Sequence, residues 1–448
     1  MCGVAGAINV PDATATIRMM LHAQQNRGQD AAGMVSFSDD VVYEHRSPGT
    51  VTTNFPDEVI DTLPGSIAIG HNRYATASNS RGFKNTQPFV LSVDGKPITI
   101  AHNGNFTNIA DVERNQLRGT PFFSESDTER FFRLIIKKHR SNTLEQSTIT
   151  ALEEMQGSCS AVIATPDKLL AIRDSSGNRP LFWVRYEDGY LVASEPTALD
   201  AVDAQHWQEV EPGTLVSLSS TNEPVITSFE PKARKRFCPF ELVYFGQITS
   251  RLYNIRVDSI RHDFGRALAK EHPVQAEIIA GIPDSGTLSG LGFAEANGYG
   301  SYEHAAIIRR HNTGRTFTRA RQRSRENAVN EKFGFNSELI LGKEIVLVDD
   351  SLVRGTTSKR ITEELRKRGA TKVHWRIPSP QVIGACEYGI ATKSGELLAT
   401  GRSNVEMARH VGADSLEFLS MEGFHKVITN HGVSPKDCCF ACMDGNYW

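Results

Sequence analysis

The sequence predicts an α/β protein of at least two domains. Its 448 residues exceed what one hydrophobic core usually organises. Apolar segments of strand length alternate with helical patterns along both halves, but the spacing of these segments differs between the halves. A polar, proline-containing stretch, Thr221–Phe237, separates them, and we therefore place the two domains at residues 2–230 and 231–448.

The first half is predicted to form short strands with helices between them. The expected strands are Ser66–Gly70, Ile98–His102, Ser160–Thr165, Leu169–Arg173 and Tyr190–Ser194, and the expected helices are Ala15–Gln25 and Asp127–Lys138. This mixture favours a layered α/β domain with two sheets.

The second half is predicted to contain a βαβ unit of a parallel sheet. The expected strands are Ala276–Ile282, Glu344–Val348 and Lys372–Ile377. The helix Ser358–Arg368 precedes the last of these strands and is expected to end at Gly369. Ligands of such sheets bind at the carboxyl ends of the strands.

Composition excludes several classes of protein. The formal net charge of −3 gives no basic excess, so nucleic acid is not an expected partner. No apolar run approaches the roughly 20 residues of a membrane span, and Met1–Val4 does not resemble a signal peptide, so we expect a cytoplasmic protein without a membrane partner. The seven cysteines are an odd number in a long chain and are expected to be catalytic, metal-bound or inert.

Cys2 is a candidate nucleophile. Removal of Met1 would place a thiol and an α-amino group on one residue, and an amine with a pKa of roughly 7.7–8.0 can accept the thiol proton. A cysteine at position 2 is, by itself, better explained as an accident. Its company favours catalysis, because the first half also contains Arg27-Gly28-Gln29-Asp30-Ala31-Ala32-Gly33, His71-Asn72-Arg73-Tyr74-Ala75-Thr76, His102-Asn103-Gly104-Asn105 and Ser126-Asp127-Thr128-Glu129.

These blocks resemble the class II glutamine amidotransferase domain over roughly residues 2–225. The resemblance implies a four-layered Ntn-hydrolase fold in which Cys2 attacks the amide carbon of glutamine, while Asn103 and Gly104 donate hydrogen bonds to the oxyanion. It further places Arg73 on the α-carboxylate of glutamine and Asp127 on its α-ammonium group, with Arg27 and Thr76 in the same site. A salt bridge between Arg73 and Asp127 is the alternative explanation for this pair.

A second constellation is the run from Ile345 to Ser358. A buried strand ends in Asp349 and Asp350, and small hydroxyl residues follow at a helix start. Backbone N–H groups and the helix dipole can hold a terminal phosphate there, while the carboxylates face ribose hydroxyls or magnesium. The alternative is an acidic turn followed by a threonine N-cap, but the length of the run favours a ligand site.

This run resembles the substrate loop of type I phosphoribosyltransferases, and the whole chain resembles the glutamine phosphoribosylpyrophosphate amidotransferase family. The resemblance implies that glutamine and 5-phosphoribosyl 1-pyrophosphate yield phosphoribosylamine, glutamate and pyrophosphate, the first committed step of purine synthesis. It assigns Mg²⁺ to Ser285, Asp349 and Asp350. The implied substrate-binding residues are Asp284, Ser285, Gly286, Arg315, Lys332, Asp349, Asp350, Ser351, Arg354, Gly355, Thr356, Thr357 and Ser358.

The same resemblance implies a loop bearing Arg315 and Lys332 that closes over the substrate and helps to form an ammonia channel. It also implies feedback by purine nucleotides and a homo-oligomer, a dimer or a tetramer. Departures from the family pattern include Asn26 before Arg27, where histidine is common, and Asn178 in place of an aromatic residue. They bear on loop closure and coupling of the two sites more than on the sites themselves.

The C-terminal cysteines suggest a third site. Cys439 and Cys442 form a C-x-x-C pair, which alone is compatible with zinc, redox chemistry or packing. Resemblance to one branch of the family adds Cys238, Cys386 and the flank Gly445-Asn446-Tyr447, and implies a [4Fe-4S] cluster on Cys238, Cys386, Cys439 and Cys442. The adjacent Cys438 is not an expected ligand.

Two other functions remain as alternatives: a divergent paralogue in a specialised nucleoside pathway, and a phosphoribosyltransferase-like protein that binds its ligand to regulate transcription. The regulator would not need Cys2, Asn103 and Asp127 together. Asparagine synthetases and sugar-phosphate aminating enzymes share the glutaminase half, but the run Asp349–Ser358 argues against both.

Overall fold

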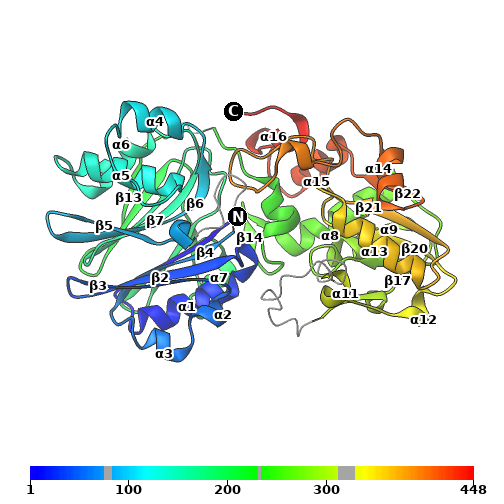
Figure 1. The fold of residues 1–448 in the computed structure, drawn as a ribbon, viewed down its shortest axis with the longest axis horizontal. Coiled ribbons are helices and arrows are strands. Elements are labelled where there is room, and N and C mark those ends of the chain that lie inside the picture. The colour runs from blue at the N-terminus through cyan, green and yellow to red at the C-terminus, as the bar shows by residue number, and fades with distance from the viewer. Residues whose placement is uncertain (75–82, 231–233, 311–327) are drawn as a thin grey trace.

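The computed structural model describes residues 1–74, 83–230, 234–310 and 328–448. In Figure 1 the strands of the first half lie at the left and those of the second half at the right, with the N-terminus at the centre between them. No helix in these ranges is long and apolar enough to cross a membrane. The predicted class, α/β with two different halves, is confirmed.

The first half contains two antiparallel sheets. The seven-stranded sheet has the order β11 (Gln208–Glu209), β9 (Phe182–Tyr186), β10 (Gly189–Ala193), β1 (Gly3–Ile8), β4 (Ile67–Arg73), β2 (Ala31–Ser38) and β3 (Val41–Pro48). The six-stranded sheet has the order β13 (Val225–Ser228), β12 (Thr214–Ser219), β8 (Lys168–Arg173), β7 (Gly157–Ala164), β6 (Lys96–Phe106) and β5 (Phe89–Val93). All five predicted strands are present, and β1 and β6 carry the first site.

Helices cover the outer faces of both sheets and complete four layers. The helix α1 (Ala13–Ala23) packs through Ile17 and Leu21 on Ala5 and Ala68 of the first sheet. The helices α5 (Asp127–His139) and α6 (Leu144–Leu152) pack on the second sheet. Between the sheets, apolar side chains of β1, β2 and β4 meet those of β6, β7 and β8 in a separate core. The four-layered fold is therefore confirmed.

The second half is built on a parallel sheet with helices on both faces. Its order is β17 (Ser301–Tyr302), β16 (Ile278–Gly281), β20 (Glu344–Val348), β21 (Lys372–Ile377) and β22 (Ser415–Phe418). The helices α8 (Val257–Glu271), α9 (Thr287–Asn297) and α15 (Met421–Asn430) pack on one face, and α13 (Thr356–Lys367) and α14 (Asn404–Val411) on the other. Because β16 and β20 are neighbours, the loops after them meet at one edge.

The two halves share one continuous hydrophobic core. Met1 and Ala5 of the first half belong to the same buried cluster as Phe240 and Phe264 of the second. The end of the chain returns to this junction, where Phe237 N–H donates to the Asp437 carbonyl at 2.7 Å and Cys439 N–H donates to the Phe237 carbonyl at 2.8 Å. The last strand of the first half ends at Ser228, and the boundary near residue 230 stays a prediction.

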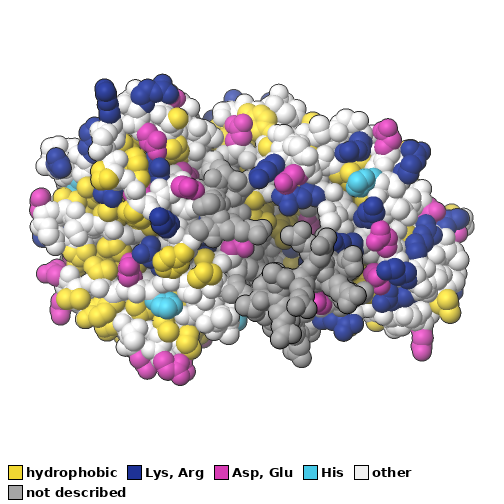
Figure 2. Space-filling view, in the orientation of Figure 1, with side chains coloured by type: hydrophobic (Ala, Val, Ile, Leu, Met, Phe, Trp, Pro, Cys, Tyr) yellow, Lys and Arg dark blue, Asp and Glu magenta, His cyan; other side chains and the backbone are white. Residues whose placement is uncertain are grey.

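Basic and acidic side chains are mixed on the surface of the second half. Figure 2 shows Lys and Arg side chains over the right of the molecule, around α13, with Asp and Glu beside them. The ion pairs there include Arg366–Asp414 at 2.5 Å, Arg368–Glu364 at 2.5 Å and Lys372–Glu344 at 2.6 Å. Each of these pairs balances a cation locally.

The helices α8 and α9 pack at backbone distance because both contain glycine at the contact. A Cβ atom on Gly292 would lie 2.0 Å from the carbonyl oxygen of His262, and one on Gly265 would lie 1.9 Å from that of Ser289. Neither clash can be relieved by rotating a side chain. This packing fixes α9, which begins directly after the loop Pro283–Gly286 of the second site.

We expect Gly292→Ala to lower the free energy of unfolding by about 2 kcal/mol or more, since the added methyl forces the helices apart. Chemical denaturation of the purified variant measures the change. The matched control is Gly395→Ala, whose Cβ meets no atom within 4 Å, and which should change stability by less than about 0.5 kcal/mol. Equal stabilities of the two variants would contradict the described packing.

Candidate active sites

The predicted nucleophile lies where the two sheets of the first half meet. Cys2 directly precedes β1, and its backbone N–H donates to Asn103 Oδ1 of β6 at 3.1 Å. Its thiol lies 3.9 Å from the carbonyl oxygen of Tyr74. This hydrogen bond joins the start of one sheet to a strand of the other, and it holds the Cys2 thiol near the predicted oxyanion donor.

The geometry of Asn103 suits an oxyanion donor. Its Oδ1 is occupied by Cys2, while its Nδ2 is buried and has no hydrogen-bond partner in the described part of the chain. A buried, unpaired amide N–H is costly unless a ligand uses it. Gly104 follows, and a Cβ there would lie 2.0 Å from the Ser158 carbonyl oxygen. Only glycine fits this backbone position.

Asp127 lies at the start of α5, beside the end of β6. Ser126 caps the helix through Thr128 N–H, and the carboxylate of Asp127 accepts the N–H of Phe106 at 3.0 Å and that of Thr128 at 2.9 Å. Asp127 is half-buried, so one carboxylate is both fixed and reachable. A carboxylate at this position can pair with an α-ammonium group.

Arg73 ends β4 on the other side of the site. Its side chain is buried, and burial lowers the pKa of its guanidinium while the neighbouring Cys2 and Asp30 raise it. The backbone carbonyl of Arg73 accepts the N–H of Asp30 at 3.0 Å. Thr76, the remaining residue predicted to bind glutamine, lies outside the described residues.

Arg27 has a role that sequence did not suggest. Its Nε donates to the carbonyl oxygen of Cys2 at 3.0 Å, and its terminal nitrogens pair with Glu195 at 2.7 Å and Glu241 at 2.8 Å. Burial alone would lower the pKa of this guanidinium, but the two carboxylates raise it. Because all three nitrogens contact protein, the geometry favours positioning of Cys2 over contact with glutamine, which stays a prediction.

The three residues predicted to bind magnesium meet at the ends of neighbouring parallel strands. Asp349 and Asp350 follow β20, and Ser285 follows β16; Ser285 Oγ donates to Asp350 Oδ1 at 2.5 Å. Burial raises the pKa of both carboxyls, and the charge of Asp350 raises that of Asp349 further. Asp350 is buried and Asp349 half-buried, and two adjacent carboxylates with little access to water favour a bound cation.

The predicted pyrophosphate loop packs directly against the carboxylates' strand. A Cβ on Gly286 would lie 2.4 Å from the Val348 carbonyl oxygen, so the loop after β16 touches the end of β20. The peptide between Pro283 and Asp284 is cis. Asp284 is exposed and forms an ion pair with Arg309. The loop therefore presents its backbone at the carboxyl edge of the sheet.

The predicted phosphate loop ends at the N-terminus of α13. Gly355, at φ 71°, caps this twelve-residue helix without a side-chain hydrogen bond. Thr356 and Thr357 are exposed at its first turn, Ser358 is buried and Ser351 donates to Asp350. Such a helix start offers backbone N–H groups to a phosphate. Arg354 is paired with Glu396 at 2.5 Å in this state.

Lys332 lies near the carboxylate of Asp349 in the second site. It ends α11 (Ala328–Lys332), is exposed, and its charge lowers the pKa of Asp349. Arg315 and the loop that carries it lie outside the described residues.

Three polar residues near the sites were missed by sequence reasoning: Glu195, Glu241 and Tyr244. Burial raises the pKa of Tyr244 to about 12, with Asp350, Tyr74 and Asp349 adding to the shift. Tyr244 therefore lies between the two predicted sites. For Glu241 the sequence did contain a signal. An unpaired charge is unfavourable in an apolar run, and Glu241 is the one carboxylate in Cys238-Pro239-Phe240-Glu241-Leu242-Val243-Tyr244-Phe245.

The four predicted cluster ligands line one small cavity. Its wall is formed by Asn178, Arg179, Cys238, Cys386, Tyr388, Ile390, Cys439, Ala441 and Cys442. Cys438 is absent from the wall, and its thiol faces the Ser434 carbonyl at 3.8 Å. Burial raises the pKa of Cys238 to about 12 and raises that of Cys442 well above its ordinary value. No three acidic, His or Cys side chains among the described residues converge closely enough for a single metal ion.

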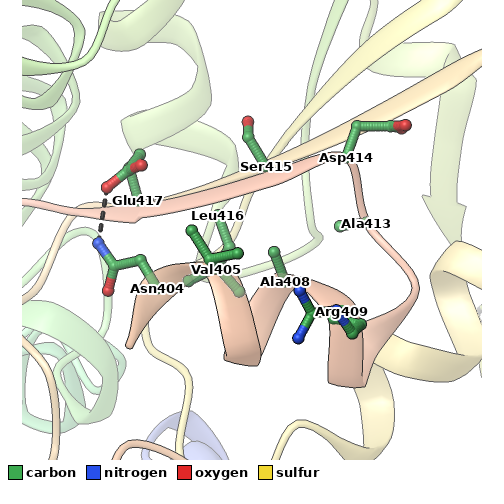
Figure 3. Close-up of a pocket in the computed structure, with 9 residues that line it drawn as sticks. All are labelled: Asn404, Val405, Ala408, Arg409, Ala413, Asp414, Ser415, Leu416 and Glu417. Atoms are coloured by element: carbon green, nitrogen blue, oxygen red, sulfur yellow. Dashed lines mark hydrogen bonds between the residues drawn. The ribbon is translucent and has the colours of Figure 1, made fainter. Parts of the chain in front are cut away.

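Another pocket lies apart from these sites. Figure 3 shows it between α14 and the edge strand β22, with Val405 and Ala408 on one side and Leu416 on the other. Its volume is about 290 Å³, and Asn404 Nδ2 donates to Glu417 Oε2 at 2.6 Å across its end. None of the residues predicted to bind substrate or metal lines it.

Fold and geometry together define a class: an Ntn-hydrolase glutaminase joined to a phosphoribosyltransferase. The glutamine amidotransferase domain model matches residues 71–201. Amidophosphoribosyltransferase 1 of Arabidopsis thaliana is 40% identical over 457 residues, covering 100% of this chain and 78% of its own. Amidophosphoribosyltransferase of Bacillus subtilis is 37% identical over 453 residues, covering 100% of this chain and 94% of its own.

Solved structures agree with the sequence comparison. The B. subtilis glutamine phosphoribosylpyrophosphate amidotransferase, complexed with ADP and GMP, matches with a TM-score of 0.91 and 36% identity, over 100% of this chain and 97% of that one. The chain belongs to the amidophosphoribosyltransferase family. Its function is the glutamine-dependent amination of 5-phosphoribosyl 1-pyrophosphate, the first committed step of purine synthesis.

We expect Asp349→Asn to raise the melting temperature of the metal-free, substrate-free protein by about 2 °C at pH 8. The folded-state pKa of this carboxyl lies above the unfolded value of roughly 3.9, so its contribution to stability is present below that pH and lost as pH rises through the folded-state pKa. Asparagine does not ionise, and the difference from wild type should therefore grow from pH 4 to pH 8.

Calorimetry in the presence of a chelator measures this difference. The control is Glu277→Gln, because Lys343 lies 2.8 Å from that carboxylate and lowers its pKa; it should give no increase at pH 8. A lower melting temperature for Asp349→Asn at pH 8 would show that the two carboxyls do not repel each other in the folded protein.

Proposed function

We propose that Cys2 is the nucleophile that hydrolyses glutamine and that Asn103 and Gly104 form the oxyanion hole. The observation that carries this is the position of Asn103, which holds the Cys2 N–H through Oδ1 and leaves a buried Nδ2 without a partner. Each oxyanion donor stabilises the transition state by about 2.7–4 kcal/mol in comparable enzymes.

The base in this proposal is the α-amino group of Cys2, exposed by removal of Met1. An α-amino group has an ordinary pKa of roughly 7.7–8.0 and can therefore accept the thiol proton near neutral pH. The thiolate attacks the amide carbon, ammonia leaves with that proton, and water hydrolyses the thioester to glutamate.

We propose that Arg73 and Asp127 hold the α-carboxylate and α-ammonium groups of glutamine, assisted by Thr76. Asp127 is fixed by two backbone N–H groups, so it binds without reordering a flexible side chain. Recognition of both charged ends places the amide carbon relative to Cys2.

We propose that the second site holds 5-phosphoribosyl 1-pyrophosphate at the carboxyl ends of β16 and β20. Backbone groups of Asp284, Ser285 and Gly286 face the pyrophosphate, and Lys332 and Arg315 approach it from the loop. The residues assigned to the 5′-phosphate are Ser351, Arg354, Gly355, Thr356, Thr357 and Ser358. Ser285, Asp349 and Asp350 would hold Mg²⁺, which would supply positive charge against the departing pyrophosphate. Ammonia forms the new C–N bond at the anomeric carbon as the C–O bond breaks.

The ammonia channel is proposed to pass between the halves at Tyr74 and Tyr244. Tyr74 contributes the carbonyl beside the Cys2 thiol, and its ring contacts Phe245 edge-on with centroids 6.2 Å apart. Tyr244 contacts the same Phe245 at 4.9 Å and lies near Asp349 and Asp350. These aromatic side chains form a continuous contact from the first site toward the second, and Tyr244 at its end is 45% exposed.

We propose that Cys238, Cys386, Cys439 and Cys442 hold a structural [4Fe-4S] cluster. The cavity they line also contains Arg179, whose Nη1 is buried, has no hydrogen-bond partner among the described residues and lies 3.8 Å from Glu241. A cation placed there balances thiolate ligands, as a cluster with net negative charge requires. Zinc needs four sulfurs within about 2.3 Å of one point, whereas a four-iron cluster spaces them further apart, in keeping with their arrangement around a cavity.

Two further assignments follow from the family. Because the B. subtilis structure contains ADP and GMP, we propose purine nucleotides as feedback inhibitors of this chain, and a homo-oligomer, a dimer or a tetramer, as its assembly. The protein is proposed to act in the cytoplasm on glutamine and 5-phosphoribosyl 1-pyrophosphate, without nucleic acid or membrane partners.

Cys2→Ala is expected to lower glutamine-dependent synthesis by roughly a thousandfold or more, because the nucleophile is lost. Ammonia-dependent synthesis should remain within about twofold of wild type, since the second site is unchanged. Assays of pyrophosphate release with each nitrogen donor compare the two activities in one preparation. Glutamine use by Cys2→Ala at the wild-type rate would disprove the assignment of the nucleophile.

Anaerobically purified protein is expected to contain about four irons and four acid-labile sulfides per chain, with broad visible absorption. Cys386→Ser should lose the colour, because a ligand is removed. Cys438→Ser should keep it and serves as the matched control, since Cys438 adjoins a proposed ligand but faces away from the cavity. Colourless protein with one zinc per chain would contradict the cluster and leave the two enzyme sites unaffected.

A further inference from the structure

Glu241 is a carboxylate from the second half that is fully buried against the first. It begins the turn Glu241–Phe245, beyond the junction between the halves, and its side chain has 0% exposure. Its Oε1 and Oε2 accept hydrogen bonds from Arg27 Nη2 at 2.8 Å and Nη1 at 3.1 Å. This bidentate geometry fixes the plane of the guanidinium as well as its position.

Arg27, held in this way by Glu241, in turn restrains the backbone of Cys2. Its Nε donates to the Cys2 carbonyl oxygen at 3.0 Å, on the opposite side of the residue from the bond between Cys2 N–H and Asn103. The two backbone bonds together set the direction of the Cys2 side chain. Rotation of the Cys2 backbone would displace the thiol from the unpaired Nδ2 of Asn103.

Glu195 cannot replace Glu241 in this arrangement. Glu195 Oε1 bonds Arg27 Nη1 at 2.7 Å, but its Oε2 is already occupied by Gln247 N–H at 2.8 Å and Ser250 Oγ at 2.9 Å. Without Glu241, Arg27 Nη2 would be buried without an acceptor. Arg179 Nη1 also lies 3.8 Å from Glu241, so removal of this carboxylate would leave two buried cations close together.

We propose that Glu241 is a positioning residue for glutamine hydrolysis, acting on Cys2 through Arg27. The second half thereby supplies part of the first site's support, although Glu241 contacts neither substrate. This inference rests on the proposed role of Cys2. A misplacement of about 1 Å in a reacting group lowers rates by about a hundredfold, and the expected loss lies in kcat because Arg73 and Asp127 still bind glutamine.

Glu241→Gln tests the proposal, since it keeps the side chain's shape and removes its charge. We expect kcat for glutamine to fall about a hundredfold, with KM for glutamine and ammonia-dependent synthesis within about twofold of wild type. Retained ammonia-dependent synthesis also shows that the variant is folded. Glu241→Asp, which keeps the charge but withdraws it by one methylene, should show a smaller loss in kcat.

A double-mutant cycle separates this role from a general structural one. Arg27→Gln should reproduce the loss in kcat, and adding Glu241→Gln to it should cause little further loss, because both changes break one connection. Glu145→Gln is the control, because Glu145 is a half-buried carboxylate of the first half that pairs with Lys168 at 2.7 Å; its kcat should match wild type.

Three results would overturn the inference: multiplicative losses in the double variant, a change confined to KM, or an equal loss of ammonia-dependent synthesis. Cys2→Ala, measured alongside, distinguishes failure of the inference from failure of the assigned nucleophile. If Cys2→Ala loses glutamine use and Glu241→Gln does not, only the positioning role is wrong.

Discussion

The carbonyl of Cys2 is held by a guanidinium that two buried carboxylates balance, and these carboxylates come from different halves of the chain. Without Glu195 and Glu241, the buried guanidinium of Arg27 would be an uncompensated charge in this junction, which is strongly destabilising. The fold must therefore bring the turn Glu241–Phe245 against the start of β1 before the first site is complete. The shared hydrophobic core around Met1 and Phe240 supplies the burial that makes the pairing necessary.

The two predicted metal sites follow a different logic, because each brings like groups together. Asp350 is buried beside the half-buried Asp349, and four cysteines line one cavity. Burial raises the pKa of Asp349 and Asp350, and also that of Cys238, Cys439 and Cys442, so the ionised groups favour a bound metal. Stability given up at these positions is recovered on binding, as is common for functional sites.

Much of the fold of the second half could be predicted because its local sequence patterns agree with the elements that it forms. The bounds of β20 and β21 match the expected Glu344–Val348 and Lys372–Ile377, since apolar runs between turn residues leave little ambiguity. Strand β1 was missed because Gly3–Ile8 is buried along its whole length and shows no alternation. The partners of Arg27 were also missed, because ion pairs between distant segments leave no local pattern. Asn26, a departure from the family pattern, donates to Phe245 O at 2.6 Å and so supports the junction.

The return of the chain's end to the junction has a consequence for the order of assembly. Phe237 pairs with the segment at Cys438, and Trp448 stacks on Tyr388 with ring centroids 4.2 Å apart. During synthesis the ribosome releases Cys439 and Cys442 long after Cys238, so the cysteine cavity closes only after those two residues have emerged. Until then Cys238 and Phe237 are uncovered, although the strands of the first half are already complete. A nascent chain must protect this thiol from oxidation, and premature termination before Cys439 leaves the junction open to proteases.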